Sequence, residues 1–106
     1  MATFVRGQVY WATFDQSLGR KPWLVVSNNA RNRALASVLV ARITTTDKPR
    51  VRSIVQLPHG ECVVGSVLCD DLQHMYPDDN PELAGALSPS VMRQVDGALA
   101  VALGLV

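Results

Sequence analysis

The stretch "KPWLVVSNNARNRALASVLVARITT", residues 21–45, decides the fold class, because it places two valine-rich runs on either side of a polar segment. "WLVVSN" (23–28) predicts a buried strand with Pro22 at its start, where a missing N–H is tolerated. "NARNRA" (29–34) can form one helical turn, and "SVLVARITT" (37–45) predicts a further strand that ends in a threonine cluster. This pattern is typical of a mainly β domain.

Outward from this stretch, other segments have the same character. "GQVYWATF" (7–14), "VRSIVQL" (51–57) and "CVVGSVLCD" (62–70) each predict a strand, with Gly65 marking a bend or a close backbone approach. "YPDDNPELAGAL" (76–87) is predicted as a loop that can contain a helical turn and a short edge strand. Several short strands between turn signals indicate a small, strongly curved barrel or sandwich.

The C-terminal segment changes to a helical period. Ser88 is a natural N-cap, Pro89 suits the first helical position, and Gly104 can end the helix in a left-handed conformation. Apolar residues recur between them at helical spacing: Val91, Val95, Leu99 and Ala102. The sequence therefore predicts a helix of about four turns. Its end, 98–106, is apolar on nearly all sides, which favours burial against a second copy of the chain.

Length and composition indicate one folded domain over residues 1–106. The chain is 48% hydrophobic and 18% charged, as in folded globular proteins. No apolar run approaches the roughly 20 residues that a membrane span needs, and the first ten residues have no secretion signal. We therefore expect a cytoplasmic protein without a membrane partner.

Charge is divided unevenly along the chain. Residues 1–52 hold nine of the ten Lys and Arg and two carboxylates, a net charge of +7, whereas residues 53–106 have a net charge of −6. Such asymmetry indicates a surface for nucleic acid, although folding can mix the two halves in space.

The two cysteines, Cys62 and Cys69, lie seven residues apart on one predicted strand. They would point to opposite faces, which disfavours a disulfide. Together with His59 and His74 they form a conceivable zinc set, but the spacing lacks the close ligand pairs of structural zinc sites. We predict small, buried, free cysteines and neither a metal nor another cofactor.

Cations and hydroxyls gather at two points of the basic half. Arg20 and Lys21 precede a strand, and Thr44, Thr45 and Thr46 end another. RNA supplies its own nucleophile, the 2′-OH, so a ribonuclease needs proton transfer and groups that stabilise the pentavalent phosphate. Cations and hydroxyls can provide that stabilisation, whereas the two isolated histidines give no support to a paired-His mechanism. Threonine also favours strands and turns for purely structural reasons.

Five segments in order resemble the MazF/PemK family of toxins. They cover nearly the whole chain: "RGQVYWATF", "GRKPWLVVSNNARN", "VLVARITTT", "GSVLCDDLQ" and "LSPSVMRQVDGALAVALGL". The resemblance implies a compact SH3-like β-barrel with a C-terminal α-helix, a homodimer, and a metal-independent, sequence-specific endoribonuclease acting on single-stranded RNA. It also implies inhibition by a cognate antitoxin that covers the RNA groove.

The resemblance also implies a catalytic pair, an Arg before the Pro and a Thr after the Ile, which by position are Lys21 and Thr44. Lysine departs from the pattern, since it cannot form the bidentate fork of Arg with phosphate, so Arg20 is an alternative cation. PemK-type members use a further Arg where this chain has Leu68, while Asp70 matches. The short loop between the first two strands can alter base recognition.

The remaining basic and amide residues are predicted to line an RNA groove, or else to serve the ends of strands. The predicted RNA-binding residues are Arg6, Asn28, Asn29, Arg31, Arg42, Thr45, Thr46 and Asp70. Two other functions stay open: a non-enzymatic toxin of the CcdB type that binds gyrase, and a degenerate member that binds RNA or antitoxin without cleaving.

Overall fold

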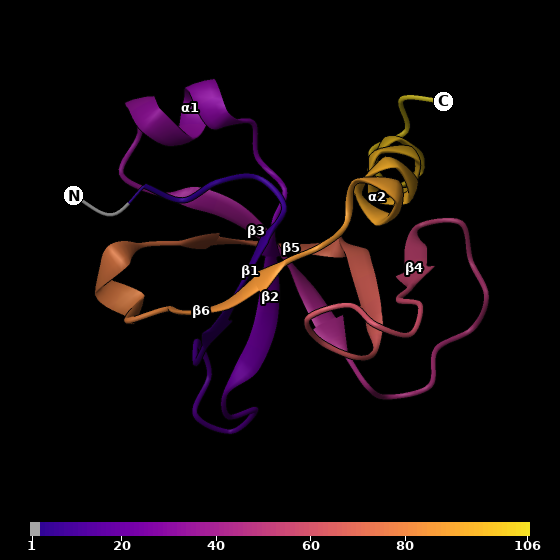
Figure 1. Cartoon of the computed structure of the whole chain (residues 1–106), viewed down its shortest axis with the longest axis horizontal. Helices are drawn as coiled ribbons and strands as arrows, with labels where there is room; N and C mark the ends of the chain where they lie inside the picture. The colour runs from indigo at the N-terminus through magenta and orange to yellow at the C-terminus, as the bar shows by residue number, and fades with distance from the viewer. Residues whose placement is uncertain (1–2) are drawn as a thin grey trace.

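The computed structural model describes residues 3–106 and contains one sheet and two α-helices (Figure 1). In chain order the elements are β1 (Gln8–Ala12), β2 (Lys21–Val25), α1 (Asn29–Ala34), β3 (Val38–Thr44), β4 (Ile54–Gln56), β5 (Ser66–Met75), the 3₁₀ turn η1 (Pro77–Asp79), β6 (Glu82–Ala86) and α2 (Pro89–Ala102). The predicted mainly β chain with a C-terminal helix is confirmed.

The six strands pair antiparallel in the order β4-β5-β3-β2-β1-β6. Within residues 3–106 the outer strands β4 and β6 do not pair with each other, so the sheet is barrel-like but open. Between β3 and β5 the register shifts: Ala41 pairs with Leu72, whereas Arg42 pairs with Leu68. Such bulges bend a strand and increase its twist. β5 pairs with β3 on both sides of this bulge, and its first residues also pair with β4.

Strand boundaries differ from the predictions. β2 begins at Lys21, two residues earlier than predicted, and ends at Val25. The prediction of a strand over 62–70 is wrong at both ends, since β5 runs from Ser66 to Met75. Gly65 has a φ of +123°, which interrupts extended pairing at its start. β4 covers only three residues of the predicted 51–57.

Two hydrophobic clusters lie on opposite faces of the strands. On β2, Leu24 belongs to the cluster that α2 covers, while Trp23 and Val25 belong to the other, with Phe4, Tyr10 and Met75. Both faces of β2 are therefore buried, which explains its continuous apolar run.

Helix α2 packs against β4 and β5 (Figure 1). Ser88 caps its N-terminus, accepting a hydrogen bond from the Val91 N–H, and Gly104 has a φ of +72° just after its end. The predicted helix and both of its end signals are confirmed. After the helix, Leu103, Leu105 and Val106 are exposed, so their burial by a second copy stays a prediction.

Candidate active site

A cavity of about 440 Å³ lies where β2 begins and β3 ends. Its lining brings together residues that are far apart in the sequence, among them Trp11, Arg20, Lys21, Thr44, Thr45 and Cys62. Both predicted catalytic cations and the predicted catalytic hydroxyl therefore line one cavity.

The pairing of β2 with β3 explains this meeting. Trp23 lies opposite Arg42 in this antiparallel pair, and the same register continued by two residues places Lys21 opposite Thr44. Side chains of directly opposite residues lie on the same face of a sheet. A cation at the start of one strand and a hydroxyl at the end of its neighbour are thus brought together by register alone.

Thr44 is held in place by its neighbours. Its side chain is buried, and its Oγ1 accepts a hydrogen bond of 3.1 Å from the Thr46 N–H. Its carbonyl is so close to Gly65 that a Cβ on that glycine would lie 2.3 Å from the Thr44 oxygen. The prediction that Gly65 marks a close backbone approach is confirmed. Because the Oγ1 lone pairs receive the amide, the hydroxyl hydrogen stays available for donation.

The two cations of the cavity differ in their partners. The Arg20 Nη2 lies 2.7 Å from the Glu82 Oε1. Lys21 is half-buried, and no carboxylate of residues 3–106 lies within ion-pair distance of its ammonium group. Lys21 is therefore the cation whose charge is available in this cavity.

A second cavity, of about 460 Å³, adjoins the first through Thr44 and Thr45. The loop between β3 and β4 lines it and contributes Thr46, Lys48 and Arg50. A polyanion that occupied both cavities would pass over the threonine cluster with cations on each side.

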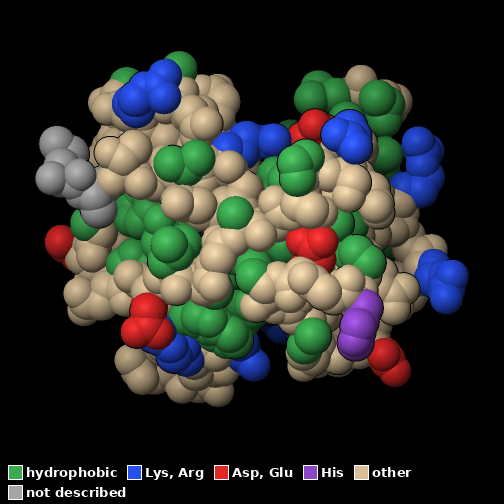
Figure 2. Space-filling view, viewed as in Figure 1, with side chains coloured by type: hydrophobic (Ala, Val, Ile, Leu, Met, Phe, Trp, Pro, Cys, Tyr) green, Lys and Arg blue, Asp and Glu red, His purple; other side chains and the backbone are tan. Residues whose placement is uncertain are grey.

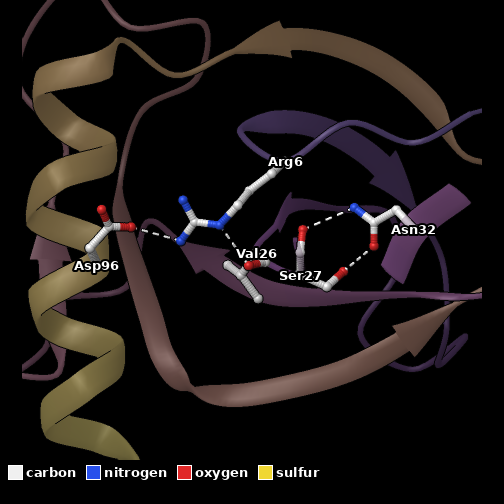
Figure 3. A network of polar contacts seen from close by, with 5 residues as sticks. All are labelled: Arg6, Val26, Ser27, Asn32 and Asp96. Atoms are coloured by element: carbon white, nitrogen blue, oxygen red, sulfur yellow. Dashed lines mark hydrogen bonds and ion pairs between the residues drawn. The ribbon is translucent and has the colours of Figure 1, made fainter. Parts of the chain in front are cut away.

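The positive charge of residues 1–52 does not form one patch on the face shown in Figure 2, where Lys and Arg are scattered between hydrophobic groups. Arg6 shows why (Figure 3). Its Nε donates to the Val26 carbonyl at 2.8 Å, its Nη2 to Asp96 of α2 at 2.7 Å, and its backbone N–H contacts the Asn29 side chain. Arg6 thus ties the N-terminal segment to the residue that follows β2, to α1 and to α2, and it does not line the Lys21 cavity.

The other predicted RNA-binding residues around α1 also have partners within the fold. The Asn28 side chain accepts from the Arg31 N–H and caps α1, and the Arg31 guanidinium donates to the Ser37 carbonyl. Asp70 is exposed in the part of β5 that has no β3 partner. None of these three lines either cavity described above, so RNA contact by Arg6, Asn28, Asn29, Arg31 and Asp70 stays a prediction.

The two cysteines differ in burial. Cys69 is buried in β5, and burial, with the neighbouring Asp70 carboxylate, raises its thiol pKa to about 11. Cys62 is exposed at the cavity and lies outside any strand, so the prediction that both are buried on one strand is wrong for Cys62. Partial burial of its thiol raises the pKa of Cys62, and the Glu61 carboxylate adds to this. Both cysteines are free, as predicted.

The predicted site omitted Trp11 and the segment from Cys62 to Val64, which close the cavity. No local signal marks these residues, because they meet Thr44 only through the folding of distant segments around one cavity. Within residues 3–106 no three His, Cys, Asp or Glu side chains converge on a metal site, and no helix is long and apolar enough to cross a membrane.

The fold is an open, barrel-like antiparallel sheet with a C-terminal helix, and it brings Lys21 and the buried Thr44 hydroxyl to one cavity. Residues 5–103 match the family of PemK-like, MazF-like toxins of type II toxin–antitoxin systems. The chain belongs to this family.

Relatives and solved structures agree with this assignment. Endoribonuclease MazF4 of Mycobacterium tuberculosis is 40% identical over 95% of this chain and 93% of its own. A solved mycobacterial endoribonuclease in complex with its cognate antitoxin is 38% identical, covers 97% of both chains and superposes with a TM-score of 0.87. A MazE–MazF structure from Deinococcus radiodurans is 27% identical with a TM-score of 0.81 over 98% of each chain.

Proposed function

We propose that this chain is the endoribonuclease toxin of a toxin–antitoxin pair and that it cleaves single-stranded RNA at the Lys21–Thr44 cavity. The observation that carries the proposal is the meeting of these two side chains at one cavity. Relatives named endoribonucleases, 40% identical over 95% of the chain, support it and favour RNA cleavage over the CcdB-type alternative.

The proposed reaction uses the RNA's own hydroxyl. The 2′-OH gives its proton to water as its oxygen bonds to the adjacent phosphorus, and the bond from phosphorus to the 5′-oxygen breaks. The leaving 5′-oxygen takes a proton from water, so the products carry a cyclic phosphate and a 5′-OH. The Lys21 ammonium, which has three donors and no acceptor, stabilises the charge of the pentavalent phosphate. Thr44 donates its hydroxyl hydrogen to a phosphate oxygen while its Oγ1 accepts from Thr46.

Lys21 is the preferred cation over Arg20. The Arg20 guanidinium is paired with Glu82 through Nη2, whereas Lys21 has no carboxylate partner within residues 3–106. The cavity lining contains no imidazole or carboxylate, so proposed catalysis rests on phosphate stabilisation rather than on paired histidines.

RNA mapping tests this function. Purified protein is incubated with total RNA in the presence of EDTA, and new 5′-OH ends are sequenced. We expect cleavage within a short recognition sequence, and its loss in Thr44→Ala. A folded wild-type protein that produces no new ends would contradict the proposal and favour the degenerate, non-cleaving alternative.

We further propose a homodimer that forms through the end of α2. Leu103, Leu105 and Val106 are 59%, 73% and 81% exposed, an apolar terminus that a second copy would cover. Sedimentation at micromolar concentration should give a dimer, and a Leu105→Lys variant should shift it toward monomer. A wild-type protein that sediments as a monomer would overturn the proposed homodimer.

A cognate antitoxin is the proposed protein partner, acting in the cytoplasm where the RNA is. A solved mycobacterial relative forms such a complex. An acidic and apolar segment would suit a cavity with Lys21 beside Trp11 and Val64.

The affinity for RNA should fall as the salt concentration rises, because phosphate contacts release counterions. Unchanged RNA affinity between low and physiological salt would contradict RNA binding through phosphate charge.

A further inference from the structure

A third cavity, of about 180 Å³, lies beside the proposed active site on the other side of Lys21. Phe14 from the first loop, Trp23 of β2, Arg42 of β3 and two β5 side chains, Asp71 and Gln73, line it together with Lys21. Its volume is well below the roughly 300–1,000 Å³ typical of pockets for drug-sized ligands. The space therefore suits a single planar ring system.

Two buried donors in this lining have no acceptor. Within residues 3–106, neither the Trp23 Nε1 nor the Arg42 Nε has a hydrogen-bond partner, although both atoms are buried. Trp23 is only 5% exposed. The two residues are directly opposite each other on β2 and β3, so their side chains are neighbours on one face. Buried donors are nearly always paired in folded proteins, and two unpaired ones beside a cavity indicate a ligand that brings an acceptor.

The lining of this cavity also offers acceptors. The Asp71 Oδ2 lies 3.5 Å from the Arg42 Nη1, longer than the roughly 2.7–2.9 Å of a strong charge-assisted hydrogen bond. The Asp71 carboxylate therefore keeps capacity to accept from a ligand, and the Gln73 amide lies beside it in the lining. Phe14 stands edge-on to Trp23 with ring centroids 4.8 Å apart and adds an aromatic wall.

We propose that this cavity is a specificity pocket for one nucleobase next to the scissile phosphate and that it selects the keto bases, guanine and uracil. The inference rests on the proposed RNA cleavage. Both bases carry a ring carbonyl beside an imino N–H. The carbonyl oxygen, with two lone pairs, accepts from Trp23 and Arg42, and the imino N–H donates to Asp71.

Adenine and cytosine fit this arrangement poorly. At the corresponding edge they carry an exocyclic amine, which is a donor, beside a ring nitrogen that accepts. Their amine would face the donors of Trp23 and Arg42, and their ring nitrogen would face the Asp71 carboxylate. A site built with buried polar groups rejects a ligand that leaves those groups unpaired.

Lys21 lines both this pocket and the proposed active site. A base seated between Trp23 and Asp71 would therefore hold its own phosphate close to the Lys21 ammonium. The selected base would lie one nucleotide or less from the bond that breaks, at a fixed position in every cleaved site.

Cleavage of a random-sequence RNA pool, with sequencing of the 5′-OH products, tests the proposal. For the wild-type protein we expect guanine or uracil at one fixed position beside the cleaved bond. Asp71→Asn and Trp23→Phe should each reduce the preference for keto bases at that position by about tenfold and leave the other positions unchanged. Trp23→Phe keeps an aromatic ring in the core and removes the indole donor together with part of the buried volume.

Asp78→Asn is the matched control, because this exposed carboxylate lies in η1 and lines none of the three cavities. Its cleavage profile should equal that of the wild type. Circular dichroism establishes that each variant is folded. Cleavage without a keto-base position, or with a keto-base position that neither folded variant changes, overturns this inference and leaves the proposed function standing. Absence of cleavage by the wild type overturns both.

Discussion

The basic side chains at the two ends of β2 differ in their partners. At its start, Lys21 is half-buried at a cavity without a carboxylate partner in residues 3–106. Beyond its end, Arg6 donates to the Val26 carbonyl and pairs with Asp96, and Arg31 donates to Ser37. Basic residues are proposed to serve chemistry at one end, whereas they hold the fold together at the other. A count of positive charge along the sequence does not separate these roles, whereas a census of hydrogen-bond partners does.

The largest effect on stability should come from Gly65, whose backbone lies against the Thr44 carbonyl at the cavity. Gly65→Ala would place a Cβ 2.3 Å from the Thr44 oxygen at a φ of +123°. We expect the free energy of unfolding to fall by roughly 3 kcal/mol or more, measured by urea denaturation. Gly60→Ala is the control: its φ is +96°, but nothing lies within 4 Å of the added Cβ, so a loss of about 1 kcal/mol is expected. Equal losses would mean that the contact with Thr44 contributes nothing.

Next in size is the loss of the positioned hydroxyl. Thr44→Ala should lower single-turnover cleavage by about a hundredfold or more, the usual scale for one donor to an anionic transition state. RNA binding should change far less, because one neutral hydroxyl adds little to phosphate charge contacts. Thr44→Ser keeps the hydroxyl and should restore most of the rate. A rate in Thr44→Ala within fewfold of the wild type would remove Thr44 from the mechanism.

The cations of the cavity give a sharper comparison. Lys21→Ala should reduce cleavage at least about tenfold more than Arg20→Ala, because Arg20 is engaged by Glu82. Glu82→Gln releases Arg20 and tests whether a freed guanidinium can replace the ammonium. Rescue of Lys21→Ala by Glu82→Gln, or a larger loss in Arg20→Ala, would make Arg20 the catalytic cation.

At the other end of β2 the effect should be on stability. Arg6→Ala removes the hydrogen bond to Val26 and the ion pair with Asp96 and should lower the free energy of unfolding by about 1 kcal/mol. Arg93→Ala, an exposed α2 residue with no ion pair in the described chain, should change it by less than about 0.5 kcal/mol. Unchanged stability in Arg6→Ala, together with weaker RNA binding, would move Arg6 to the RNA groove.

The smallest effect concerns pH. Burial raises the pKa of Cys69 from 9.0 to about 11, so folding favours the neutral thiol. This contribution to stability is complete below about pH 9 and is lost as pH rises toward 11. Cys69→Ala should therefore show a weaker decline in the free energy of unfolding between pH 9 and pH 11 than the wild type. Cys62→Ser serves as the comparison, and parallel curves for Cys69→Ala and the wild type would contradict the assignment.

The sequence alone indicated the family, the C-terminal helix and the approximate positions of the strands, but not where several strands begin and end. Valine-rich runs, the Ser88–Pro89 start and the Gly104 end predict the strands and α2, because those signals act over a few neighbouring residues. The resemblance implied Lys21 and Thr44 as a catalytic pair. Both residues line one cavity, and their catalytic roles stay predictions. The expected short edge strand and helical turn before α2 are also present, as β6 and η1.

Only the tertiary structure decided which side chains meet and which are already occupied. The extra residues of β5 opposite β3, the fold of Cys62–Val64 over Thr44, and the pairs of Arg6 with Asp96 and Arg20 with Glu82 join segments 20 to 90 residues apart. These contacts depend on sheet curvature and on α2 packing, which no local window contains. Whether a cation is free is a property of its surroundings in space, because an ion pair is set by distance and burial rather than by position along the chain.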